Sequence, residues 1–177
     1  MAKGRKRRVL ANHLGVFATL VHERVDAALT RTSGLGPSDN QALVILGSAP
    51  GMTVRGLERQ LGLSQSATVR LVDRLQAAGH VVRRQGRDKR ELALFLSALG
   101  EDCCERLLTA RQNVLAMLTA NFDKDERRLL QDMIDRLFPL LDNDDMDVDQ
   151  RCRTWDRDEH RRQDELLGHR EKEDATP

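Results

Sequence analysis

The chain has 177 residues, with 29 Lys and Arg, 28 Asp and Glu, and a formal net charge of +1 at pH 7. Only 3% of the residues are aromatic while 40% are hydrophobic, and this balance favours helix over strand. No segment approaches the ~18 apolar residues of a membrane span, no secretory signal follows the basic segment Lys3–Arg8, and three Cys cannot form a disulfide framework. We therefore expect a mainly helical cytoplasmic protein with no membrane partner.

The small net charge conceals an uneven distribution. Residues 1–141 hold 22 Lys and Arg against 15 Asp and Glu, whereas residues 142–177 hold 7 against 13. Within the first part, residues 51–96 carry nine basic and four acidic residues. Concentrated positive charge is typical of proteins that bind nucleic acid, although a charge run read alone is more often a solvated surface.

The first predicted element is a long amphipathic helix from about Arg5 to Thr30. Its apolar residues recur three and four positions apart, at Leu10, Leu14, Phe17, Val21, Val25 and Ala28. Glycines and a proline interrupt the pattern at residues 33–37. Ser38 then begins a second helix, with Gln41 in the capping-box position, that ends near Gly47.

Two short helices with a glycine-containing turn follow. The first runs from Thr53 to Leu61 and is ended by Gly62, and the second runs from Gln65, capped by Ser64, to about Ala78. This order is typical of a helix-turn-helix. The second helix is expected to turn Ala67, Leu71, Leu75 and Ala78 toward the core.

Strands and two further helices complete the pattern. Residues 80–84 and 91–96 read as two strands of a hairpin wing, and both faces of the second strand are expected to be partly covered. Ser97 caps a long helix to about Asn121. Asp123 and Glu126 form a capping box for a last helix that would bury the apolar side chains Leu130, Met133, Ile134, Leu137 and Leu141. The charged tail beyond is expected to be flexible, with helix only in places.

These elements predict a mainly α fold: a winged helix-turn-helix with a two-stranded β-wing, plus N- and C-terminal helices that form a dimerisation region. The expected domain spans residues 5–141, with the winged core at about 38–97, dimerisation helices at about 5–30 and 98–141, and the tail at 142–177. A single-chain helical bundle is the alternative.

The second helix of the helix-turn-helix is the candidate for reading the DNA major groove. The residues near its N-terminus are expected to reach base edges, and the wing tip a minor groove. Asp88 would position a neighbouring Arg. The candidate DNA-binding residues are Arg55, Ser64, Gln65, Ser66, Thr68, Val69, Arg70, Arg74, Arg83, Arg84, Arg87, Asp88, Lys89 and Arg90.

The run from Thr53 to Leu75 resembles the helix-turn-helix of the MarR (multiple antibiotic resistance regulator) family. Gly79, the triplet Asp88-Lys89-Arg90 and the segment Leu96–Gly100 continue the likeness. The resemblance implies a homodimer that binds a pseudopalindromic operator in double-stranded DNA, usually as a repressor. It also implies release by a small molecule bound between the dimerisation helices and the winged core, with the side chains of His13, Phe17 and His22 as candidate contributors.

Three other functions are alternatives to a ligand-released DNA-binding regulator. Cys103 and Cys104 would serve a thiol-based redox regulator, although Cys103 lies on an apolar seam and reads better as core. A winged helix can also serve as a protein-interaction module. An enzyme is not supported, because the sequence has no Ser–His–acid order, no phosphate-binding glycine loop and no metal-ligand spacing, so we expect no catalytic residue, no metal and no cofactor. The acidic run Asp142–Asp149 lacks the central Gly and final Glu of a calcium loop.

Overall fold

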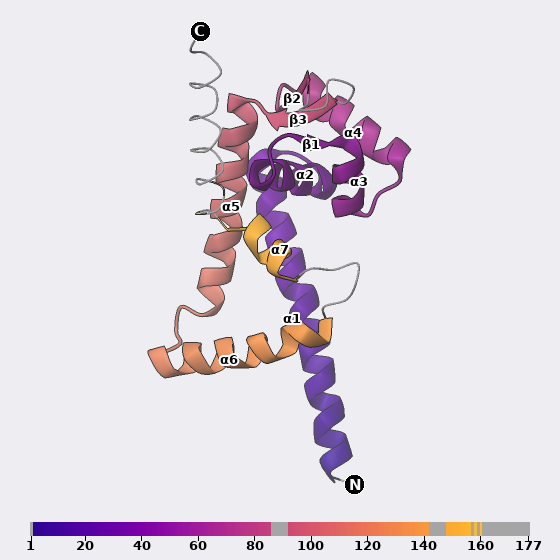
Figure 1. Cartoon of the computed structure of the whole chain (residues 1–177). Helices are drawn as coiled ribbons and strands as arrows, with labels where there is room; N and C mark the ends of the chain where they lie inside the picture. Colours follow the sequence, from indigo (N-terminus) through magenta and orange to yellow (C-terminus); the bar gives the residue numbers. More distant parts are fainter. Residues whose placement is uncertain (1, 86–91, 142–147, 157, 159, 161–177) are drawn as a thin grey trace.

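The structure is a computed structural model that describes residues 2–85, 92–141, 148–156, 158 and 160. Figure 1 shows a head of short helices and a small sheet, formed by residues 52–85 and 92–96, above a base of longer helices in residues 2–33 and 98–141. In chain order the elements are α1 (Ala2–Ser33), α2 (Pro37–Ser48), β1 (Met52–Thr53), α3 (Val54–Leu61), α4 (Gln65–Ala77), β2 (Val81–Gln85), β3 (Leu92–Leu96), α5 (Ala98–Leu118), α6 (Lys124–Leu141) and α7 (Val148–Thr154). Within the described residues, no helix is both long enough and apolar enough to cross a membrane.

Helix α2 lies at the centre of the fold. Every residue from Ala42 to Ser48 is buried, and α2 contacts α1, α3, α4, α5 and β3. A helix that is apolar on all sides belongs inside a protein rather than on its surface. α2 therefore connects the head with the base helices.

The Ser64 cap and the Gly62 ending agree with the sequence prediction, whereas Thr53, predicted as the first residue of its helix, is the N-cap of α3. The Thr53 hydroxyl accepts a hydrogen bond from the Gly56 amide at 3.1 Å, and the Ser64 hydroxyl accepts one from the Ala67 amide at 3.4 Å. Gly62 ends α3 with φ +64°, a left-handed conformation that glycine adopts at little cost. The two caps and this turn fix where α4 begins.

The sheet has three strands in the order β1-β3-β2, one more than predicted. β3 pairs antiparallel with both neighbours. Leu94 of β3 lies opposite Met52 of β1, and Phe95 of β3 lies opposite Val82 of β2. Ala93, Leu94 and Leu96 are buried, so both faces of β3 are partly covered, as the sequence indicated. The third strand is only two residues long, too short to give a periodic signal.

Two details of the helices differ from the prediction. Ser38 does not cap α2, because Gly36 occupies the N-cap position and Pro37 the first turn, where its fixed φ suits a helix start. The core face of α4 consists of Thr68, Leu71, Val72 and Leu75 rather than the predicted set that included Ala67 and Ala78. Ala78 is exposed and lies just after the helix.

The base helices carry much exposed apolar surface. α1 packs against α5 and α2 near its C-terminal end, where Ala28 and Leu29 are buried, but residues 8–20 are all exposed. The predicted capping box of α6 is present, since Asp123 Oδ1 accepts from the Glu126 amide at 2.9 Å and Glu126 Oε2 from the Asp123 amide at 2.9 Å.

The expectation that α6 buries its apolar residues is wrong for the single chain, because α6 contains no buried residue. Met133, Leu137 and Leu141 are exposed, and Leu130 and Ile134 are only half-buried. An amphipathic helix gains most of its stability from covering its apolar face. The described part of the chain therefore leaves the apolar face of α6 uncovered.

Part of the charged tail is helical and contacts the body. α7 lies against α2, Thr154 and His160 are buried, and the ring of Trp155 lies 4.8 Å from the Arg111 guanidinium. His160 donates from Nε2 to the Thr154 carbonyl at 2.7 Å, and its Nδ1 is 3.6 Å from Cys104 Sγ. The absence of a side chain at Gly47 makes this fit possible, because an added Cβ would lie 2.8 Å from His160 Nδ1.

Candidate nucleic-acid interface

One face of α4 is open to solvent along the whole helix. Gln65, Ser66, Val69 and Arg70 are exposed, while the opposite face is held in the core by Leu71, Val72 and Leu75. Val69 is 38% exposed, unusual for an apolar side chain that has a buried face beside it. An exposed row of amide, hydroxyl, apolar and guanidinium groups matches what a major-groove edge offers, including the thymine methyl group.

Thr68 does not belong to this face. The side chain of Thr68 is fully buried and its hydroxyl donates to the Ser64 carbonyl at 3.0 Å. The prediction that Thr68 contacts DNA is therefore wrong, because Thr68 lies on the core face of α4 with Leu71, Val72 and Leu75. Ser64 itself is exposed, as predicted.

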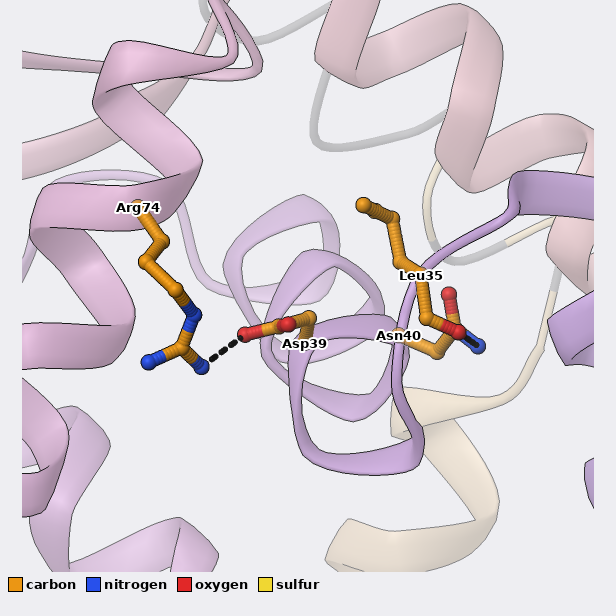
Figure 2. A network of polar contacts seen from close by, with 4 residues as sticks. All are labelled: Leu35, Asp39, Asn40 and Arg74. Carbon is orange, nitrogen blue, oxygen red and sulfur yellow. Dashed lines mark hydrogen bonds and ion pairs between the residues drawn. The ribbon is translucent and has the colours of Figure 1, made fainter.

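Arg74 is fixed by an ion pair that the sequence did not predict. Its Nη2 lies 2.8 Å from Asp39 Oδ1 in α2, and Figure 2 shows the Arg74 side chain extended toward that carboxylate. The Asp39 side chain is only 15% exposed and that of Arg74 is 59% exposed. Since a guanidinium has five N–H donors, Arg74 keeps donors for a phosphate while Asp39 fixes its position.

The anchor of Asp39 is itself supported by its neighbours. Asn40, which follows Asp39 in the first turn of α2, is fully buried. The side-chain nitrogen Nδ2 of Asn40 donates to the Leu35 carbonyl at 3.4 Å, as Figure 2 shows, and its side-chain oxygen Oδ1 accepts from the Ser33 hydroxyl at 2.6 Å. The chain between α1 and α2 is thereby tied to α2, so Asp39 presents its carboxylate to α4 from a rigid position.

Arg83 and Arg84 in β2 differ in their contacts. Arg83 reaches back to α4, where its guanidinium donates to Asp73 at 2.7 Å and to Gln76 at 2.5 Å. These contacts tie β2 to α4 and leave the Arg83 side chain only 25% exposed, which suits a positioning role better than the predicted direct contact with DNA. Arg84 is exposed and its guanidinium lies 5.5 Å from the centre of the Phe95 ring.

The remaining predicted DNA contacts are divided between two regions. Arg55 is exposed in the first turn of α3. The candidates at the wing tip lie outside the described residues; the candidates are Arg87, Asp88, Lys89 and Arg90.

The predicted ligand residues lie on exposed parts of α1. His13 and Phe17 belong to the stretch of α1 that is entirely exposed in the single chain, so they lie on open helix surface rather than in a cleft. His22 is also exposed and its Nε2 lies 3.4 Å from Asp26 Oδ2 one turn further on. The structure therefore does not bring these three side chains together within one chain.

The cysteines are arranged as core residues more than as sensors. Cys103 and Cys104 are both buried in α5, whereas Cys152 in α7 is exposed. Burial raises the pKa of the Cys103 thiol above its ordinary value, which keeps it protonated and unreactive at neutral pH. The environment of Cys103 therefore does not favour the redox alternative.

A helix-turn-helix with an exposed second helix, backed by a small antiparallel sheet, defines a winged helix-turn-helix protein. A family model described as the MarR family matches residues 33–91 of the chain. In three dimensions the chain is similar to a MarR family protein from Bacillus stearothermophilus, with a TM-score of 0.68, 27% sequence identity, and coverage of 77% of this chain and 96% of that one. It is also similar to the apo form of MarR from E. coli, with a TM-score of 0.57, 25% identity, and coverage of 70% and 96%.

The chain is thus similar to the MarR family in the sequence of residues 33–91 and in its fold. Among curated proteins it is 36% identical over 86 residues to the uncharacterized HTH-type transcriptional regulator YcgE of Bacillus subtilis (strain 168). That match covers 48% of this chain and 53% of the relative, so the chain spans about half the length of the curated relative it matches. Members of this family are transcription regulators rather than enzymes, in agreement with the expectation from the sequence.

Proposed function

We propose that the protein is a DNA-binding transcription regulator that places α4 in the major groove of an operator. The observation that carries this proposal is the exposed face of α4, where Gln65, Ser66, Val69 and Arg70 lie free of the core beside two tethered arginines. The tethers matter because a recognition helix must keep one orientation relative to the body to read base edges.

We further propose that the protein acts as a homodimer and reads a pseudopalindrome. The exposed apolar faces of α1 and α6 support this, since a twofold interface would bury the same side chains on both protomers. Two α4 helices related by the twofold axis would enter successive major grooves about one helical turn apart. Binding over a promoter would repress transcription in the cytoplasm, where the three free thiols remain reduced.

Release by a small molecule completes the proposed cycle. α2 contacts the base helices α1 and α5 on one side and the head elements α3, α4 and β3 on the other. A ligand that binds more tightly to one arrangement of base and head shifts the population toward that arrangement and changes the spacing of the two α4 helices. The same connection gives regulation without a separate hinge.

Replacing Arg70 with alanine should weaken binding to the preferred operator by roughly 1–3 kcal/mol, because Arg70 is exposed on the reading face and contributes either a base or a phosphate contact. Fluorescence anisotropy with a labelled operator at fixed salt measures this change. Arg31→Ala is the matched control, since Arg31 is an exposed arginine at the end of α1 outside the reading head. Equal affinities for wild type and Arg70→Ala would show that α4 does not read the operator through this face.

A further inference from the structure

A cavity of about 450 Å³ lies between α3 of the head and α7 of the tail. Residues from both segments line it, although they are far apart in the sequence. The lining side chains that bear on its chemistry are Thr53, Arg59, Gln60, Gln150 and Arg151. The cavity therefore exists only where the tail lies next to the head.

Among the residues that the structure describes, the lining is basic on both sides and includes no acidic residue. Arg59 comes from α3 and Arg151 from α7, and neither forms an ion pair with a described residue. Other arginines of the head have acidic partners, as Arg74 and Arg83 do. Two guanidinium groups that face one space repel each other unless an anion lies between them.

The same face of α3 is shaped to leave this space open. Gly56 and Arg59 are three residues apart and Gln60 is four from Gly56, which places them on one side of the helix. Gly56 has no side chain to fill the space, and an added Cβ would lie 2.7 Å from Met52 Cγ, which also lines the cavity. Arg55, the predicted DNA contact of α3, does not line it.

We propose that this cavity is a binding site for a small organic or inorganic dianion, such as a dicarboxylate or a phosphate compound. Each guanidinium offers a planar pair of N–H donors that fits a carboxylate or phosphate group, and the carboxamides of Gln60 and Gln150 supply further polar contacts. A bound dianion would link α7 to α3 through one charged group on each side. The site is separate from the reading face, and the proposal does not depend on DNA binding.

Another cavity has a different character. It has a volume of about 600 Å³ and lies between α5 and the segment after α7, and its charged lining residues, among those that the structure describes, are Arg111, Asp156 and Asp158. Two carboxylates beside one guanidinium favour an anion less than two guanidinium groups do. Of these two cavities, the one at Arg59 and Arg151 is better suited to a negatively charged ligand.

The test is isothermal titration calorimetry of the full-length protein with pyrophosphate and with succinate, at constant ionic strength in chloride. We expect saturable binding of at least one probe, weakened about tenfold or more by Arg59→Gln and by Arg151→Gln, as loss of a charge-assisted hydrogen bond predicts. Arg55→Gln on α3 and Arg31→Gln at the end of α1 are matched controls for the loss of one positive charge, because neither residue lines the cavity. Both controls should bind the probe like wild type.

Three results would overturn the proposal. The first is no saturable binding of either probe at millimolar concentration. The second is an equal loss in all four variants, which would indicate general charge attraction. The third comes from a parallel titration with a short DNA duplex: if Arg59→Gln and Arg151→Gln weaken the duplex but not the probes, the two arginines serve the DNA backbone instead.

Discussion

Substitution of Gly100 by alanine is expected to lower the free energy of unfolding by about 3 kcal/mol, at the upper end of what overpacking costs. Gly100 is buried in the first turn of α5. An added Cβ would lie 2.1 Å from the His80 carbonyl oxygen and 3.0 Å from the His80 carbonyl carbon. Both are backbone atoms, and the same carbonyl oxygen accepts a hydrogen bond from the Ser97 amide at 2.9 Å, so it has little freedom to move.

Urea denaturation at one fixed protein concentration measures this effect, because the stability of an oligomer depends on concentration. The matched control is Gly15→Ala in α1, where no atom lies within 4 Å of an added Cβ. There the better helix propensity of alanine should leave stability unchanged or raise it by up to about 1 kcal/mol. A Gly100→Ala protein that unfolds at the same urea concentration as wild type would show that α5 does not contact the backbone after α4 this closely.

The double substitution Leu10→Asp with Leu140→Asp is expected to turn a dimer into monomers. Leu10 in α1 is 69% exposed and Leu140 in α6 is 76% exposed, so neither contributes much to the core of one chain. Four buried carboxylates at a twofold interface would be costly, while the same carboxylates on a monomer remain hydrated. Because one half-site no longer holds the second subunit in place, operator affinity should fall by about 10²–10⁴.

Sedimentation velocity and anisotropy on the same samples test both parts of this prediction. Leu99→Asp is the matched control for mass, since Leu99 is an exposed leucine in the first turn of α5, where an acidic residue suits the helix dipole. If the double variant remains a dimer, the faces of α1 and α6 are not the interface. If it becomes a monomer with unchanged operator affinity, the dimer is not required for reading.

Local signals in the sequence predicted much of the fold. The Ser64 and Ser97 caps, the capping box at Asp123 and the glycine at position 62 are all where they were expected, because each depends only on residues within one turn. The prediction that Ser38 begins the second helix was wrong for an equally local reason, because Gly36 and Pro37 already fix the start of α2. Competing local signals are hard to rank from sequence.

The candidate site was predicted less completely, because its anchors are not local. Asp39 lies 35 residues from Arg74, and no spacing rule joins them. The core face of α4 is rotated by about one residue from the face that the apolar pattern predicted, so Thr68 is buried where Ala67 was expected. The contact of His160 with Cys104 joins residues 56 positions apart and requires a glycine at position 47.

The division of charge between body and tail also gains a structural meaning. The tail is acidic as a whole, yet the side of α7 that faces α3 presents Arg151 next to Arg59. The segment nearest the head therefore has the opposite sign to the tail average. Net charge by segment indicates a nucleic-acid binder, but only the fold shows which charges meet.

The most direct test of the central claim, that α4 reads DNA sequence, is selection of binding sites from random duplex DNA with wild-type protein and with Arg70→Ala. The account predicts that wild type enriches a pseudopalindrome with half-sites about one helical turn apart. It also predicts that Arg70→Ala either changes the preferred bases within each half-site or weakens the enrichment. Failure of the wild-type protein to enrich any sequence, with equal retention of all duplexes, would contradict it.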